Sequence, residues 1–273
     1  LVVSTLPLAD EICYLANLRK HVCRIVNTLS VEISLGVGNK RRLSQKIKKA
    51  KQIYGEKRLV AVSEGVKSDL VEWLDFKENN VYTIYNLYDF KEISELSEQN
   101  IPTEGIGPYI LHVGRFSSQK RHDLLLDAFS RIDNSYKLVL LTDPNQILQA
   151  MIDQKGLTDR VLIAGFQKNP YPWMRNADLL VLCSDYEGLP NVLIEALICG
   201  AKVVSTNCPS GPVEILGDKN DCLVKCGDSL MLSNVMADIL SGAMIFEKPN
   251  LDKFSINNVV KKWESLAKEV GVE

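Results

Sequence analysis

The sequence predicts an α/β protein built from doubly wound parallel sheets, and two observations lead to this fold class. Short apolar runs alternate with helical patterns along most of the 273 residues, which is typical of βαβ units. Several runs are almost continuously apolar, as are strands of a sheet covered on both faces. Hydrophobic residues make up 46% and charged residues 24% of the chain, so it has the composition of globular domains rather than of disordered segments.

A first domain is predicted over residues 1–90, with strands at 1–4, 23–26, 58–62 and 81–85. Ser63 is the expected N-cap of a helix that runs to about Leu74, because its hydroxyl can accept a free backbone N–H. The sequence opens with Leu1 inside an apolar run. We therefore expect this domain to be incomplete.

The hydrophobic pattern fails over 91–108, which is the predicted interdomain linker. A second, complete domain follows over 109–250, with strands at 109–114, 137–141, 160–163, 178–182 and 201–205. An amphipathic helix is expected over 122–132, further helices begin near Gln146, Tyr171 and Leu189, and 205–214 is predicted to be a loop. The tail, 251–273, is predicted to be a helix whose buried stripe comprises Val259, Val260, Trp263, Leu266 and Ala267.

Charge and cysteine content exclude several classes of protein. A net charge of -2 gives no global field that would attract nucleic acid, so we expect no nucleic-acid partner. The seven cysteines include no C-x-x-C pair, which favours reduced thiols in a cytoplasmic protein and no metal site.

No apolar run is long enough to span a bilayer. No G-x-G-x-x-G follows a strand, which argues against a dehydrogenase.

The loop after the strand at 109–114 concentrates positive charge. Gly114 permits a turn directly after the strand, and Arg115 and Lys120 lie at the entry to the next helix. Free N–H groups at a helix start already favour an anion, so these cations indicate a phosphate site. A solvated basic loop explains the same charges, and charge alone does not choose between the two.

The loop after the strand at 178–182 carries two glutamates, Glu187 and Glu195. Gly188 allows close backbone approach to a ligand, and Pro190 suits the first turn of a helix. Glu195 then lies about one turn inside an otherwise apolar helix, where burying a carboxylate without a partner is costly. A pair of sugar or ribose hydroxyls is one such partner, and an intramolecular Arg or Lys is the alternative.

At these residues, over about 109–240, the chain resembles the nucleotide-sugar domain of retaining glycosyltransferases of family 4, which have the GT-B fold. The resemblance rests on Gly114-Arg115 and Lys120 after a strand, on Gly165-Phe166 before a short helix, and on the E-G-x-P-N-x3-E-A spacing at 187–196. Weaker similarity extends over 60–63 and 81–86. The implied architecture is two Rossmann-like domains, the first of them incomplete.

The resemblance also implies roles for individual residues. Arg115 and Lys120 would hold the diphosphate, and Glu187 would bind hydroxyls of the donor sugar, so these three form the implied catalytic set. Glu195 would bind the ribose hydroxyls. The implied donor-binding set is Gly114, Phe166, Gln167, Gly188, Leu189, Pro190, Asn191, Val192 and Glu195, of which Phe166 and Gln167 would contact the base. Two cations can stabilise a diphosphate leaving group without a metal.

The sequence departs from the family pattern at three places. Asn27 stands where the family usually has a histidine, and it can bind a sugar but cannot act as a base. Asp221 replaces a common glycine. The glycine-rich loop that usually begins the family's first domain has no counterpart after Leu1, in line with the expected incomplete domain.

Residues 40–54 are predicted to form a basic helix. Seven Lys and Arg side chains occur between Lys40 and Lys51, and Leu43, Ile47, Ala50 and Tyr54 recur at helical spacing. Such a helix can lie on an anionic membrane surface. A solvated helix that packs its narrow apolar stripe on the first domain is the alternative.

The leading hypothesis is a metal-independent retaining glycosyltransferase that moves a hexose from a UDP- or GDP-sugar to a saccharide or lipid-linked acceptor. The leaving diphosphate would help to take the acceptor proton, which agrees with the lack of a recognisable Ser-His or Cys-His pair. Family analogy implies bacterial surface polysaccharide synthesis, in the cytoplasm or at the inner face of the membrane. The alternatives are a donor-binding protein without transferase activity and a GT-B-type epimerase or phosphorylase.

Overall fold

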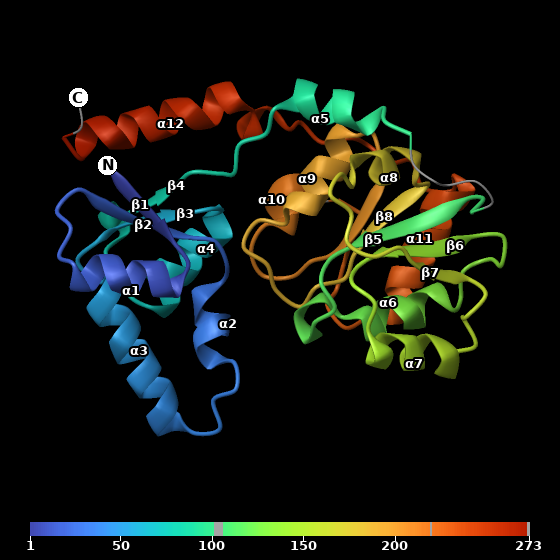
Figure 1. Cartoon of the computed structure of the whole chain (residues 1–273), viewed down its shortest axis with the longest axis horizontal. Helices are drawn as coiled ribbons and strands as arrows, with labels where there is room; N and C mark the ends of the chain where they lie inside the picture. The colour runs from blue at the N-terminus through green and yellow to red at the C-terminus, as the bar shows by residue number, and fades with distance from the viewer. Residues whose placement is uncertain (101–105, 219, 272–273) are drawn as a thin grey trace.

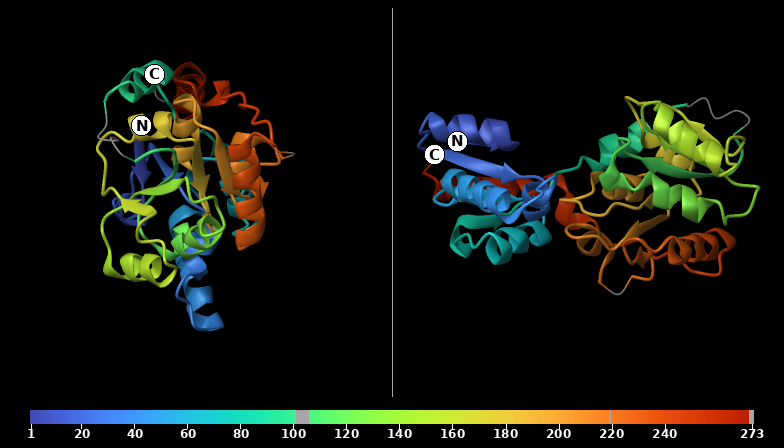
Figure 2. Two further views of the ribbon diagram at one scale, coloured as in Figure 1. Left: turned by 90° about the vertical axis from the view of Figure 1, so that its right-hand side faces the viewer. Right: turned by 90° about the horizontal axis from the view of Figure 1, so that it is seen from below.

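The computed structural model describes residues 1–100, 106–218 and 220–271 and contains two parallel β-sheets. Each sheet lies in a lobe of its own, the first drawn in blue to cyan and the second in green to orange (Figure 1). The right-hand view of Figure 2 shows the same two lobes from below. The α/β class predicted from the alternation of strands and helices is confirmed.

The first sheet has four parallel strands in sequence order. They are β1 (Val2–Thr5), β2 (His21–Ile25), β3 (Arg58–Ala61) and β4 (Val81–Thr83). Its helices are α1 (Pro7–Leu15), α2 (Leu29–Ser34), α3 (Lys40–Tyr54) and α4 (Glu64–Ser68), and a π-helical segment, Asp69–Trp73, continues α4. Ser63 caps α4 as predicted, because its side chain accepts a hydrogen bond from the backbone N of Val66.

The second sheet has six parallel strands in the order β10-β9-β8-β5-β6-β7. They are β5 (Tyr109–Val113), β6 (Lys137–Leu141), β7 (Val161–Ile163), β8 (Leu179–Leu182), β9 (Val203–Thr206) and β10 (Leu223–Val224). The chain leaves β5 toward β6 and β7, then returns to β8 on the other side of β5. The carboxyl ends of β5 and β8 therefore form the topological switch point, where ligands bind in open α/β sheets.

Both faces of the second sheet are covered by helices. On one face Ile110 packs in a core with α6 (His122–Phe129), α7 (Gln146–Gln154) and α11 (Ser229–Ser241). On the other face its neighbour Leu111 packs in a core with α8 (Tyr171–Asn176), α9 (Asn191–Ile198) and α10 (Pro212–Leu216). This alternation explains why the strands are apolar along both faces.

The segment predicted to be an irregular linker, 91–108, contains most of a helix. Helix α5 (Phe90–Ser97) packs on α8 and α9 and buries Ile93. Asp89 caps this helix by accepting from the backbone N of Lys91 and Glu92. The linker prediction missed α5 because its apolar residues are few, and residues 101–105 of the linker lie outside the described residues.

Helix α12 (Ile256–Glu269) lies along the first lobe, although it follows the second domain in sequence (Figure 1). Lys262 Nζ lies 3.4 Å from the carbonyl O of Thr83, and Tyr82 donates to the Glu269 carboxylate. The predicted stripe is only partly correct: Val259 and Leu266 are buried, whereas Val260 is 37% exposed.

Other differences from the predicted elements are local. Helix α9 begins at Asn191 rather than near Leu189, so Pro190 precedes the helix instead of lying in its first turn. The predicted loop 205–214 includes the end of β9 and the start of α10. Helices α1, α2 and α11 and the two-residue strand β10 were not predicted. None of the helices in the described ranges is long and apolar enough to cross a membrane.

Candidate active site

Two loops meet at the switch point between β5 and β8. The loop after β5 bonds to the loop after β8 through Gln119, whose Nε2 donates to the carbonyl O of Tyr186 over 2.8 Å and whose carbonyl O accepts from the backbone N of Asp185 over 2.9 Å. Arg121 adopts a left-handed backbone conformation, with φ of 48°, and its Nη1 lies 3.0 Å from Asp185 Oδ1. The fold therefore places two of the sequence-predicted loops side by side.

Lys120 and Glu187 form an ion pair between these loops. Lys120 Nζ lies 2.6 Å from Glu187 Oε1, and the side chains are 19% and 9% exposed. A charged pair so shielded is held more strongly than a surface pair, because water and salt screen it less. The structure thus brings together two of the three residues predicted to be catalytic.

Arg115, the third predicted catalytic residue, is exposed. Within the described ranges no carboxylate forms a salt bridge with it. Gly114 precedes it, and a Cβ on Gly114 would lie 3.4 Å from the Lys120 side chain and 3.5 Å from His112 Nε2. Arg115 is therefore exposed at the start of the loop in which Gly114 lies near Lys120.

Two buried histidines, His112 and His122, lie at the two ends of the loop after β5. The rings of His112 and His122 pack edge to face with centroids 4.8 Å apart. Burial lowers the pKa of His112 to about 3 and the pKa of His122 to about 4. Both rings are neutral near pH 7, so positive charge at this end of the sheet comes from the neighbouring Lys and Arg side chains.

Glu195 lies in α9 and is half-buried. Burial raises the pKa of its carboxyl group. The alternative partner considered for it, an intramolecular Arg or Lys, does not form a salt bridge with it in the part of the chain that the structure describes. Burial raises the pKa of Tyr88 and Tyr171, and the negative charge of Glu195 raises both further. A ligand with hydroxyl donors fits such a carboxylate.

The other predicted donor-binding residues fall into two groups, one at the start of α9 and one after β7. Leu189 and Pro190 are buried, and Val192 is half-buried. Asn191 Oδ1 accepts from Tyr88, at 2.6 Å, and from Asn86, so the start of α9 is tied to the segment after β4. Phe166 and Gln167 follow β7, two strands away from β5, where the Phe166 side chain is 79% exposed and Gln167 Nε2 donates to the carbonyl O of Ala164 over 2.7 Å.

Gly188 packs against the first domain. A Cβ on this residue would lie 2.0 Å from the carbonyl O of Val26 and 2.8 Å from the Cα of Asn27. Asn27 and Gly188 form an antiparallel β-bridge, and Asn27 Nδ2 donates to Glu32 Oε1 over 2.9 Å. The structure therefore gives a reason for glycine at position 188 that the sequence did not suggest: another stretch of polypeptide occupies the space of its side chain.

Three polar residues at this domain contact escaped sequence reasoning: Thr28, Ser210 and Glu214. Thr28 Oγ1 donates to the carbonyl O of Glu187 over 2.6 Å. Thr28 follows the carboxyl end of β2, and the rule that loops after parallel strands carry function would have pointed to it. The same rule covers Ser210, which lies in the loop after β9, whereas no local pattern distinguished Glu214, which lies in α10.

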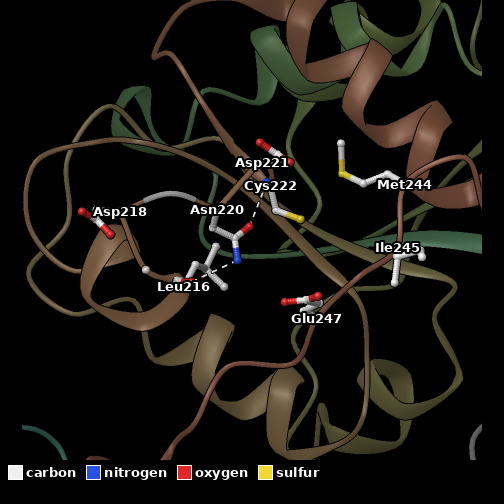
Figure 3. Close-up of a pocket in the computed structure, with 9 residues that line it drawn as sticks. Leu216, Asp218, Asn220, Asp221, Cys222, Met244, Ile245 and Glu247 are labelled. Atoms are coloured by element: carbon white, nitrogen blue, oxygen red, sulfur yellow. Dashed lines mark hydrogen bonds between the residues drawn. The ribbon is translucent and has the colours of Figure 1, made fainter.

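A cavity of about 400 Å³ lies elsewhere in the second domain, at the amino end of β10 (Figure 3). Its lining residues are Leu216, Gly217, Asp218, Asn220, Asp221, Cys222, Met244, Ile245 and Glu247. Three of these side chains are acidic and would repel a diphosphate. Ligands of open sheets bind at the carboxyl ends of strands, so this cavity is not the candidate active site.

One group of side chains has the composition of a metal site within the described ranges. Asp10, His21 and Cys23 are buried, with ligand atoms within 4.8 Å of one another. However, Asp10 already accepts from Ser4 and, over 2.9 Å, from Tyr54, and Ser4 Oγ lies 2.7 Å from His21 Nε2. We interpret the group as an internal polar network. The seven cysteines, all within the described residues, form no disulfide in the structure.

Residues 107–242, which contain both loops of the site, match the family model of glycosyl transferases group 1. The second domain belongs to this family. Over 112 residues the chain is 40% identical to the N-acetylgalactosamine-N,N'-diacetylbacillosaminyl-diphospho-undecaprenol 4-alpha-N-acetylgalactosaminyltransferase of Campylobacter jejuni, covering 40% of this chain and 31% of that relative. Over 157 residues it is 32% identical to the lipopolysaccharide 1,6-galactosyltransferase of Escherichia coli, covering 54% of this chain and 43% of that relative. The chain spans less than half the length of these curated relatives.

Solved structures of glycosyltransferases share the fold of the whole chain. HepE of Anabaena in complex with UDP and glucose superimposes with a TM-score of 0.73 at 20% identity, covering 97% of this chain and 74% of that one. The apo form of the lipopolysaccharide outer core galactosyltransferase WaaB gives a TM-score of 0.68 at 19% identity, covering 95% and 78%. The chain with its glycosyl transferases group 1 domain therefore has the GT-B fold.

Proposed function

We propose that this protein is a retaining glycosyltransferase that moves a hexose from a nucleotide diphosphate sugar to a saccharide or lipid-linked acceptor in bacterial surface polysaccharide synthesis. The observation that carries the proposal is the Lys120–Glu187 pair, with Arg115 exposed in the same loop as Lys120, at the switch point of a glycosyl transferases group 1 domain. The names of the curated relatives, which act on lipopolysaccharide and on undecaprenol-linked saccharides, support the setting.

In the proposed mechanism, positive charge stabilises the departing diphosphate. Arg115 and Lys120 bind its oxygens, and preorganised cations of this kind lower the energy of a transition state in which negative charge develops. Lys120 Nζ also pairs with Glu187 Oε1. Donor binding therefore requires Lys120 to share its three N–H donors between Glu187 and a phosphate oxygen.

The remaining groups orient the donor. Glu187 accepts hydrogen bonds from sugar hydroxyls near the reacting carbon, and Glu195 accepts from the ribose hydroxyls. The exposed ring of Phe166 stacks on the base of a UDP- or GDP-sugar, and the backbone of 188–192 contacts the sugar and phosphates. The acceptor hydroxyl attacks from the side of the leaving group, and a diphosphate oxygen takes its proton. This route needs neither an enzyme nucleophile nor a metal.

A donor screen tests the proposal. Calorimetry with UDP, GDP and their sugars is expected to give binding to the wild-type chain, and Glu187→Ala is expected to abolish transfer by the longest reading frame that contains this chain. Glu247→Ala, which removes a carboxylate from the acidic cavity of the second domain, is the matched control. Undiminished transfer by Glu187→Ala would contradict the assignment.

Product identification separates the alternatives that the residues leave open. An epimerase changes the donor sugar without acceptor, and a phosphorylase requires phosphate, whereas a transferase requires the acceptor. A donor-binding protein gives a calorimetric signal and no product under any of these conditions.

We further propose that α3 contacts the anionic inner face of the cell membrane. Ala50, Ile53 and Tyr54 bury the end of the helix, whereas Lys40, Arg41 and Arg42 at its beginning are exposed. The first half of α3 projects away from the first sheet (Figure 1). Binding to anionic but not neutral vesicles is expected, and it should fall when these three residues become Gln. Replacing the exposed Lys202, Lys261 and Lys268 by Gln is the control, and equal partitioning onto both vesicle types would contradict the proposal.

A further inference from the structure

Two hydroxyl groups of the first domain hold the backbone of the loop between β8 and α9 in the second domain. We call this loop, residues 183–190, the donor loop. Thr28 Oγ1 donates to the carbonyl O of Glu187 and Ser63 Oγ donates to the carbonyl O of Gly188, each over 2.6 Å. Thr28 is 3% exposed and Ser63 is 0% exposed. Because water has little access to either bond, losing one of them leaves a buried carbonyl without a partner.

The second domain holds the same peptide units at a further point. The backbone N of Glu187 donates to the carbonyl O of Pro209 over 3.1 Å, and the hydroxyl of the adjacent Ser210 lies 3.1 Å from Thr28 Oγ1. The N–H of Glu187 is therefore fixed from its own domain, whereas the carbonyl groups of Glu187 and Gly188 are fixed from the other domain. Moving the first domain away removes both carbonyl partners together.

Backbone packing between the domains sets the distance from these hydroxyl groups to the carbonyl groups of Glu187 and Gly188. The carbonyl of Val26 fills the space beside Gly188, and Asn27 pairs with Gly188 in a β-bridge. Thr28 directly follows this contact in sequence. The two hydroxyl groups can therefore bond to the donor loop only when the two domains are in close contact.

We propose that Thr28 and Ser63 are positioning residues that couple the approach of the two domains to the orientation of the Glu187 carboxylate. This inference rests on the proposed function, since it assigns both residues to the same donor site. Both hydroxyls donate to carbonyl groups of the loop and so act through its backbone. Together they fix two peptide planes so that the Glu187 side chain faces Lys120. The site therefore binds the donor with full affinity only when the first domain contacts the donor loop.

Thr28 offers the cleaner test of the two residues. Ser63 also accepts from the backbone N of Val66 over 3.1 Å, so Ser63→Ala removes a helix cap together with the loop bond. Thr28→Val keeps the shape of the side chain and removes the hydroxyl. Thr28→Ser keeps the hydroxyl and removes a methyl group, which makes the two substitutions a matched pair.

The experiment combines amide hydrogen exchange without donor and calorimetry with UDP- and GDP-sugars, using the whole chain. We expect amide exchange over 187–189 to be about tenfold faster, and donor affinity about tenfold lower, in Thr28→Val, because one buried hydrogen bond is lost. Thr28→Ser is expected to behave like the wild type. Exchange within α6 should be the same in all three proteins and so reports an intact second domain. Ser63→Ala is a second variant with the same expected direction.

Each outcome decides the inference. Unchanged amide exchange over 187–189 in Thr28→Val contradicts the positioning role, whatever the donor. Faster exchange with unchanged affinity for a donor that the wild type binds contradicts the coupling. If Thr28→Ser behaves like Thr28→Val, the hydroxyl is not responsible. If the wild type binds no nucleotide sugar, the proposed function fails, and the exchange experiment still decides whether Thr28 orders the loop.

Discussion

Glu214 Oε1 in the second domain lies 2.8 Å from the backbone N of Gly65 in the first domain. The other carboxylate oxygen lies 2.9 Å from the backbone N of Glu64 and 3.2 Å from the hydroxyl of Tyr85. Glu64 begins α4, so one domain supplies a negative charge to the N-terminus of a helix in the other, where free N–H groups favour it. This contact holds the domain face that carries Ser63.

Glu214→Ala is expected to loosen the contact between the domains. Two N–H groups at the start of α4 lose their acceptor, which should lower the free energy of unfolding by about 1 kcal/mol. Small-angle scattering should give a larger radius of gyration. The control is Glu264→Ala on an exposed position of α12. Unchanged scattering and stability in Glu214→Ala would show that other contacts hold the domains.

Lys120→Met is expected to destabilise the donor-free protein, because it leaves the Glu187 carboxylate shielded from water without a cation. Breaking a fully buried pair costs about 3–5 kcal/mol, and the partial exposure of Lys120 reduces the expected loss to about 2 kcal/mol. The double variant Lys120→Met, Glu187→Gln should recover part of it. Denaturant unfolding measures both effects.

A matched surface pair provides the control for Lys120. Lys91 and Glu95 in α5 are 86% and 66% exposed, with Lys91 Nζ 3.7 Å from Glu95 Oε1. Lys91→Met should change the free energy of unfolding by less than about 0.5 kcal/mol. If Lys120→Met and Lys91→Met lower the free energy of unfolding equally, the Lys120–Glu187 pair is no better shielded from water than a surface pair.

Glu195→Gln is expected to change stability and donor binding in opposite directions. Burial raises the pKa of Glu195, so the folded protein binds more protons than the unfolded chain between the ordinary carboxyl pKa and the raised value. Stability contributed by this group is therefore lost as pH rises through that window. At pH 7 the Gln variant should be more stable, by up to about 1 kcal/mol.

The ribose contact proposed for Glu195 predicts that the same variant binds the donor less tightly. Unfolding measured from pH 4 to pH 8, together with calorimetry at pH 7, checks both signs. A less stable Glu195→Gln protein would contradict the burial argument, whereas unchanged donor affinity would contradict the ribose role.

Gly188→Ala is expected to separate the donor loop from the first domain. Its Cβ would lie 2.0 Å from the carbonyl O of Val26, so one of the two backbones must move. Overpacking of this kind costs about 1–3 kcal/mol. Gly38→Ala is the control, because a Cβ at Gly38 meets nothing within 4 Å and its φ is not positive. Equal stability of the two Ala variants would contradict the close packing.

Local sequence patterns determined much of the fold and part of the site. The strand predicted at 137–141 coincides with β6, and the cap predicted at Ser63 is present. The spacing of Glu187 and Glu195 pointed to the loop and helix beside the switch point. These predictions succeed because strand periodicity, helix capping and the loop after a strand depend on residues within a few positions of one another.

Only the tertiary structure decided how the site is assembled. Thr28 and Glu187 are 159 positions apart in sequence, and no periodicity relates them. Three further contacts likewise depend on how the two domains and the strands of the second sheet pack. They are the Lys120–Glu187 pair, the contact of Gly188 with Val26, and the cap that Glu214 provides for α4. The sequence by itself predicted a basic loop after one strand and a loop with two glutamates after another; packing across the domain contact decided which groups hold them.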